Sequence, residues 1–151
     1  LRMLGTGWRL SGIFRRSTGS SMTVTTGLDR LLSGQSGNQR PNQVNGDPFG
    51  DRNSVSSYLN PAAFAQPAMG TMGNMRARNI VGPGLWQLDM ALSRTFSFRE
   101  KQELEFRVEA FNVTNSLIKG NPSTNLNQNT FGQINTSQSA RVMQFALKYT
   151  F

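Results

Sequence analysis

The feature that most constrains this chain is the two-residue alternation of its last twelve residues, ARVMQFALKYTF (140–151). Large, mostly apolar side chains occupy the odd positions, and small or polar ones occupy the even positions. Because successive side chains of a strand point to opposite faces, this pattern predicts a β-strand with one apolar face. In a soluble domain that face would cover a core, and chain ends usually fray in water. Since Phe151 still follows the pattern, the segment favours a strand whose apolar face meets lipid.

A second segment with this alternation is GLWQLDMALSRTFSF, residues 84–98. On one face it carries aromatic residues at both ends and aliphatic residues between them, and from Gln87 onward the other face is small or polar. An aliphatic centre between aromatic ends is typical of a strand that crosses a bilayer. Arg94 interrupts the apolar face, and an arginine at the bilayer midplane costs about 2–4 kcal/mol. We therefore expect Arg94 near a membrane interface, or with its side chain extended toward one.

A short polar connector, REKQ (99–102), leads to a third alternating segment, ELEFRVEAFNVTN (103–115). A connector of this length predicts an antiparallel hairpin. Beyond Ala110 the apolar and polar phases mix, which a β-bulge near Phe111 would explain.

These segments divide their side chains between two faces of one predicted sheet. The set predicted to face lipid comprises Trp86, Leu88, Met90, Leu92, Phe96, Phe98, Leu104, Phe106, Val108 and Met143. The set predicted to face a barrel lumen comprises Gln87, Asp89, Glu103, Glu105, Arg107, Glu109, Gln144 and Lys148. Two of the glutamates could in principle form an acid–base pair. A solvated ladder of charges around Arg107 is the favoured interpretation, and we expect no enzymatic activity.

The rest of the chain alternates weakly or not at all. Strand pieces are predicted within residues 7–27, whereas residues 28–84 and 116–139 are rich in Gly, Asn, Gln and Ser and read as long loops. Irregular stretches this long are unusual in a compact domain, but outer-membrane barrels combine short periplasmic turns with long external loops. The predicted fold class is therefore all-β. Antiparallel up-and-down strands would form the last part of a transmembrane barrel, with long irregular extracellular loops and the REKQ connector in the periplasm.

Composition excludes several other classes of protein. Only 36% of residues are hydrophobic, and no apolar run is long enough for a transmembrane helix, although barrel strands escape that test. Cys and His are both absent, so disulfides, thiolate nucleophiles and the usual zinc ligand sets are excluded, and we expect no metal and no cofactor. The net charge of +8 is scattered along the chain, which favours a solvated surface over a nucleic-acid site.

Several motifs together resemble the C-terminal barrel end of TonB-dependent outer-membrane receptors, in the subgroup with a carboxypeptidase-regulatory-like domain. In chain order they are NPAAF (60–64), GPGLWQLDMALSRTF (82–96), FRVEAFNVTN (106–115), NPSTNL (121–126), FGQI (131–134) and ARVMQFALKYTF (140–151). Each motif is weak alone, but together and in this order they extend from residue 60 to residue 151. FNVTN is less aromatic than the family's usual version.

The resemblance implies a 22-stranded barrel in the bacterial outer membrane, closed by a plug, that imports a bulky solute with energy supplied through TonB. This chain would supply about the last four strands. The implied partners are outer-membrane lipid, the rest of the barrel and the plug, TonB through that plug, the solute, and the barrel-assembly machinery. The implied assembly signal comprises Phe145, Leu147, Tyr149 and Phe151. The chain starts on Leu1 with no signal peptide, plug or TonB box, so we expect it to be one end of a longer protein.

An alternative from another class is a soluble or surface-exposed β-sandwich that binds ligand through its Asn-rich loops. In that fold the apolar faces would be packed beneath a second sheet. The exposure of Leu88, Phe106, Phe145 and Leu147 therefore distinguishes the two hypotheses.

Overall fold

The structure, a computed structural model, describes residues 6–99, 102–138 and 140–151. The chain forms two compact units. The first contains four long strands, and the second is built from residues 18–85 and 119–138. Residues 100 and 101 of the predicted connector, and Ser139 of a predicted loop, lie outside the described residues.

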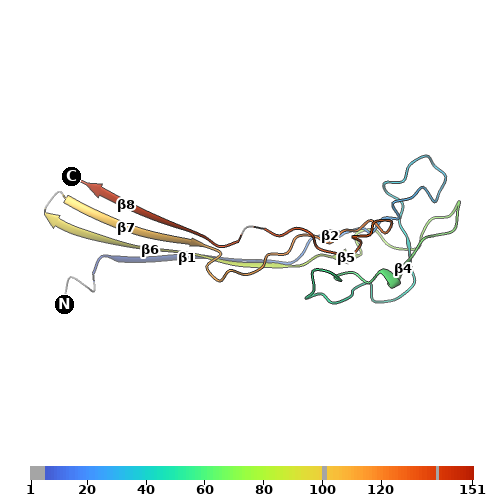
Figure 1. Ribbon diagram of the computed structural model, residues 1–151, viewed down its shortest axis with the longest axis horizontal. Coiled ribbons are helices and arrows are strands. Elements are labelled where there is room, and N and C mark those ends of the chain that lie inside the picture. Colours follow the sequence, from blue (N-terminus) through green and yellow to red (C-terminus); the bar gives the residue numbers. More distant parts are fainter. Residues whose placement is uncertain (1–5, 100–101, 139) are drawn as a thin grey trace. The chain divides into compact units, whose positions relative to one another are not determined.

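The first unit is a single four-stranded sheet in the order β1-β6-β7-β8 (Figure 1). Its strands are β1 (Trp8–Ser17), β6 (Leu85–Arg99), β7 (Gln102–Phe111) and β8 (Val142–Thr150). The pairs β6/β7 and β7/β8 are antiparallel. The predicted all-β antiparallel class is thus confirmed. The described ranges contain no helix with the length and apolar character needed to cross a membrane.

The bounds of the long strands differ from the predicted ones. Strand β6 ends one residue later than predicted, at Arg99, and β8 covers Val142–Thr150 of the predicted 140–151. The strand pieces predicted within residues 7–27 resolve into β1 and a separate two-residue strand, β2 (Ser21–Met22), which belongs to the second unit. The segment predicted as 102–115 ends as a strand at Phe111, because Asn112 adopts a left-handed backbone with φ of 53°. The phase change near Phe111 therefore marks the end of the strand and not a bulge. The register irregularity of this hairpin lies between Ser97 and Arg99.

The second unit has little regular structure. Strand β2 pairs with β5 (Ile80–Val81), β3 (Asn42–Gln43) pairs with β4 (Phe64–Ala65), and a single 3₁₀ turn, η1, covers Pro61–Ala63. The stretches predicted as irregular loops are irregular in this sense. They are nevertheless packed around buried side chains, which their Gly-, Asn- and Ser-rich composition does not predict.

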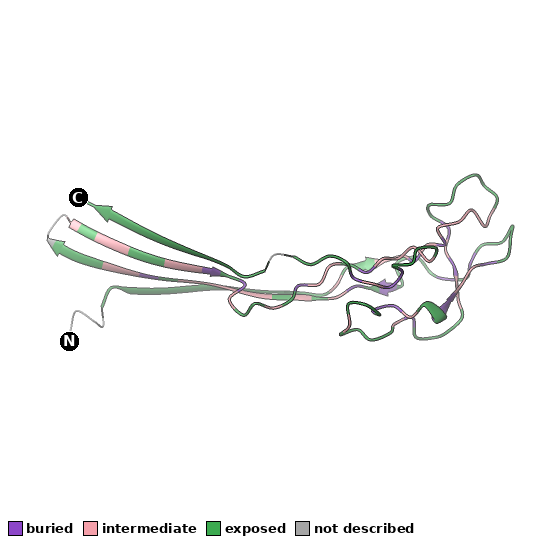
Figure 2. Ribbon diagram, in the orientation of Figure 1, coloured by how far each residue is buried: buried purple, intermediate pink, exposed green. Residues whose placement is uncertain are grey.

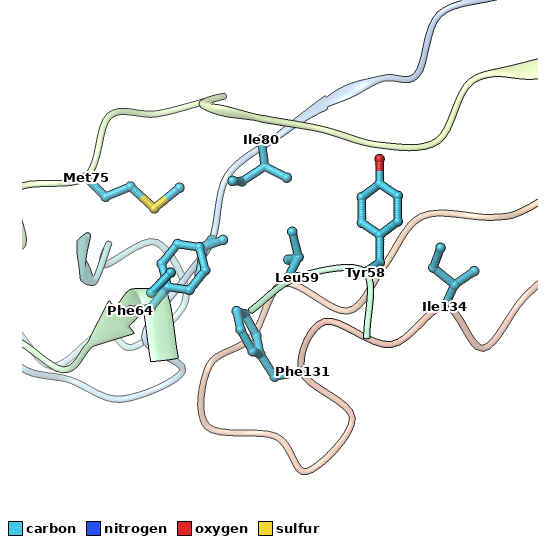
Figure 3. Packing of buried hydrophobic residues seen from close by; sticks show 9 residues of the cluster. Tyr58, Leu59, Phe64, Met75, Ile80, Phe131 and Ile134 are labelled. Carbon is cyan, nitrogen blue, oxygen red and sulfur yellow. The ribbon is translucent and has the colours of Figure 1, made fainter. Parts of the chain in front are cut away.

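The second unit encloses a hydrophobic core of its own (Figure 3). Phe64 and Phe131 meet edge to face with ring centroids 5.4 Å apart, a favourable geometry for aromatic pairs. Residues from both loop segments meet in this core, which comprises Val24, Tyr58, Leu59, Ala63, Phe64, Met75, Ile80, Phe131 and Ile134.

Two of the resembling motifs are packing elements of this core. In NPAAF the side chain of Asn60 accepts a hydrogen bond from the backbone N–H of Ala62 and so caps η1, which presents Ala63 and Phe64 to the core. In FGQI the backbone carbonyl of Gly132 accepts the N–H of Leu59 at 3.2 Å. Gly132 has φ of +75°, and a Cβ at this position would lie 2.7 Å from the Leu59 carbonyl oxygen, so glycine is required there.

Polar groups fix the outer parts of the second unit. The Asp29 carboxylate accepts hydrogen bonds from the Gln39 side chain at 2.6 Å and from the backbone N–H groups of Ser33 and Gly34. These donors, Gln39 first, hold the pKa of Asp29 below its ordinary value. The Tyr58 hydroxyl donates to the Val81 carbonyl at 2.9 Å, and burial raises the pKa of this phenol. The loop segments are therefore held by specific contacts.

Candidate functional site

The candidate site is the sheet of the first unit, in which paired residues form rows across the three strands β6, β7 and β8. Leu92 on β6 is the partner of Val108 on β7, which is the partner of Phe145 on β8. The neighbouring rows follow the same face, because paired residues of a sheet share a side. We define the apolar face by these rows: Met90–Ala110–Met143, Leu92–Val108–Phe145, Arg94–Phe106–Leu147 and Phe96–Leu104–Tyr149.

The rows between these define the polar face: Ala91–Glu109–Gln144, Ser93–Arg107–Ala146, Thr95–Glu105–Lys148 and Ser97–Glu103–Thr150. The structure thus places the predicted lipid-facing and lumen-facing residues of these rows on two opposite faces, whereas Phe98 lies at the register irregularity between Ser97 and Arg99 and belongs to no row. Trp86 and Leu88 continue the apolar face by strand alternation, and Gln87 and Asp89 continue the polar one. That the apolar face contacts lipid and the polar face contacts the barrel lumen stays a prediction.

The apolar face is uncovered in the described part of the first unit. Every residue of β8 is exposed, and Phe145 and Leu147 are 66% and 69% exposed (Figure 2). Phe106 is 42% exposed, and Leu88 is partly buried. Beyond the end of β8, Phe151 stacks on Tyr149 with ring centroids 5.9 Å apart. A face of large apolar side chains with no second layer requires another medium or partner to cover it.

The polar face carries a ladder of ion pairs. Nη2 of Arg107 lies 3.2 Å from Oε1 of Glu105, and Nη1 lies 3.4 Å from Oε1 of Glu109. Lys148 is the partner of Glu105 on the next strand. One arginine thus pairs with two carboxylates, and the charged groups that result suit a wall in contact with water. In the described ranges no three metal-ligating side chains come close enough to hold an ion.

The polar face also contains an apolar patch that the alternation of the strands does not predict. A pocket of about 280 Å³ is lined by Ile13 of β1, Ala91 of β6 and Phe111 of β7, beside Asp89 and Glu109. The sequence signal for this patch is the phase change at Phe111, which places an aromatic residue among the polar positions. The polar face is therefore not uniformly hydrophilic near the end of β7.

Asp89 fastens the end of β7. Its Oδ1 accepts the backbone N–H of Asn112 at 2.8 Å and the Gln87 side-chain amide at 2.6 Å, and its Oδ2 lies 3.4 Å from Nη2 of Arg15. The side chain of Asn112, 2% exposed, accepts from Ser116 N–H and donates to Ser116 C=O, each at 3.0 Å. Asp89 and Asn112 thus form a latch that ends the strand and starts the next connection.

Replacing Asn112 with Ala should loosen this latch. Alanine cannot make either hydrogen bond to Ser116 and disfavours positive φ, so we expect a cost of about 1–3 kcal/mol. Hydrogen exchange of the Asn112–Ser116 turn in the full-length protein should be correspondingly faster. Asn112→Gly tolerates the backbone conformation but lacks the side chain, and its exchange should lie between wild type and Asn112→Ala. Identical exchange in all three proteins would remove the latch from the description.

Comparison with protein families gives one match. Residues 1–144 match the model of a family described as outer membrane beta barrel domain. No curated protein and no solved structure matches the chain. The family match covers β1, β6 and β7 and reaches the first three residues of β8, up to Gln144.

Proposed function

Because this chain belongs to the outer membrane β-barrel domain family, we propose that its sheet completes the wall of a TonB-dependent receptor that imports a bulky solute. The location of the chain is the bacterial outer membrane, and its role is that of barrel wall. TonB coupling and solute import are the proposed steps beyond this role. They are supported by the order of the resembling motifs, from NPAAF to ARVMQFALKYTF. We propose a structural and transport role for the wall and no catalytic one.

The observation that carries the proposal is the pair of chemically different faces in one registered sheet. Apolar rows on one side and an ion-pair ladder on the other match a barrel strand, which presents apolar residues to lipid and polar residues to the lumen. The β-sandwich alternative requires a second layer over Phe106, Phe145 and Leu147. In the described part of the first unit these three side chains remain exposed, and Leu88, the fourth residue that distinguishes the two folds, is partly buried.

Two measurements on the full-length protein separate the barrel wall from the transport proposal. The protein in outer-membrane extracts should show heat-modifiable migration in gels, as folded barrels do. In addition, the purified receptor in detergent should bind the purified periplasmic domain of TonB. Heat-modifiable migration without TonB binding would reject the receptor proposal and leave the barrel wall in place.

We also propose that β8 carries the signal for the barrel-assembly machinery, in its alternating residues Phe145, Leu147, Tyr149 and Phe151. All four side chains are exposed, and β8 is an edge strand of the described sheet. A partner can therefore contact both the side chains and the backbone edge of β8. Phe151→Ala should slow conversion of newly made full-length protein to the heat-modifiable form. Thr150→Ala, on the other face, should convert at the wild-type rate. Equal rates for Phe151→Ala and wild type would argue against the signal.

A further inference from the structure

Arg94 is the one charged residue within the four registered rows of the apolar face. It is the partner of Phe106 on β7, and Phe106 is the partner of Leu147 on β8. A charged side chain in such a row is costly at the bilayer centre, and the cost falls to about 0–1 kcal/mol near the interfaces. The groups around Arg94 therefore decide whether its charge is merely inexpensive at this position or also binds a ligand.

Two aromatic rings hold the guanidinium group of Arg94. Its Cζ lies 4.3 Å from the ring centroid of Phe96, two residues further along β6, and 4.9 Å from that of Trp8 on the neighbouring strand β1. Both distances are within the range of cation–π attraction. The contact with Phe96 shows that the side chain extends along the strand toward the β6/β7 hairpin.

The spacing of aromatic residues places this group near one membrane boundary. Trp86 and Phe96 are ten residues apart, or roughly 33 Å along a strand, which a tilt of about 40° reduces to roughly 25 Å across the bilayer. That distance equals the usual height of the apolar band between aromatic girdles. With Trp86 at one girdle and Phe96 at the other, the guanidinium of Arg94 lies at the girdle nearest the hairpin.

We propose that Arg94, framed by Trp8 and Phe96, binds the phosphate of an anionic phospholipid in the periplasmic leaflet; this rests on the proposed orientation of the barrel. A guanidinium group presents several N–H donors in a plane and pairs well with phosphate oxygens, while its faces stack on aromatic rings. On an outward face at the girdle, a phospholipid headgroup supplies an anionic group of this kind. Trp8 and Phe96 are 51% and 37% exposed, so their remaining surface is open to the adjoining acyl chains.

The test uses full-length protein in detergent, with short-chain phosphatidylglycerol as the probe and native mass spectrometry as the readout. Arg94→Gln should weaken binding of the tightest phosphatidylglycerol about five- to tenfold, the scale of one basic residue at a membrane surface. Arg94→Lys keeps the charge but loses the flat stacking, and should be intermediate. The matched control is Arg9→Gln, which removes the same charge next to Trp8 but on the opposite face by alternation, and should bind as wild type does.

Three results would overturn the inference. They are unchanged phosphatidylglycerol binding by Arg94→Gln, an equal loss in Arg9→Gln, and equal displacement of the lipid by inorganic phosphate at the same concentration. Each variant is first checked for heat-modifiable migration, so that a misfolded protein is not scored as a loss of binding. Absence of TonB binding would reject the receptor proposal alone, whereas normal TonB binding with unchanged lipid affinity in Arg94→Gln would reject this inference alone.

Discussion

Replacing Leu92 with Arg in the full-length protein should sharply reduce the folded population in the outer membrane. Leu92 lies between Trp86 and Phe96 on the apolar face, in the row with Val108 and Phe145. A charge at this depth costs about 2–4 kcal/mol. The arginine side chain is too short to bring its charge from this position to either membrane interface. The measurement is the heat-modifiable fraction of the protein in outer-membrane extracts.

The matched control is Ala91→Arg, one residue away on the polar face. Ala91 is the partner of Glu109, so the new cation would meet a carboxylate in place of hydrocarbon. We expect this variant to fold close to wild-type yield. If both arginine variants accumulated equally in the folded form, the assignment of the apolar face to lipid would be wrong.

The second large effect is expected in the loop unit, where Phe131→Ala should unfold the core. Phe131 is 7% exposed and packs against Phe64, and truncating a buried phenylalanine usually costs about 3–5 kcal/mol. A core this small has little stability to lose. We expect rapid hydrogen exchange and protease cleavage within residues 18–85 and 119–138, while migration of the barrel stays heat-modifiable.

Val44→Ala provides the control for this experiment, because Val44 is exposed in the same unit. Its exchange and cleavage should match wild type. Protection of the loop segments that survives Phe131→Ala would mean that the core in Figure 3 does not hold them.

The sheet could be predicted from the sequence because its signal is local. Alternation at Leu92, Val108 and Phe145 assigns each residue to a face without knowledge of its partners, and the observed register joins the three in one row. The positions of the strand ends are predicted less accurately than the faces. Nothing in the alternation shows that Asn112 adopts a positive φ. Its backbone N–H donates a hydrogen bond to Asp89, and this contact cannot be seen in a local pattern because Asp89 lies on another strand.

The loop core could not be predicted for a related reason. Leu59 and Phe131 are far apart in the sequence and lie in segments rich in Gly, Asn and Ser, where no periodicity marks a buried face. Arg94 is an intermediate case. The sequence shows that it interrupts an apolar face and that Phe96 follows it on that face, but the ring of Trp8 beside it is known only from the pairing of strands.

The division of the loop core between two stretches of chain sets an order of events during biogenesis. Residues 18–85 and 119–138 are separated by the β6/β7 hairpin, yet backbone hydrogen bonds join them at Leu59–Gly132, Val55–Ile134 and Thr25–Thr124. Residues 18–85 cannot complete their core until the β6/β7 hairpin has been inserted and residues 119–138 can pack against them. With the loop unit outside the cell, as the barrel proposal implies, completion of its core would report that the β6/β7 hairpin has been inserted, and a molecule without that insertion would expose unfolded loops to surface proteases.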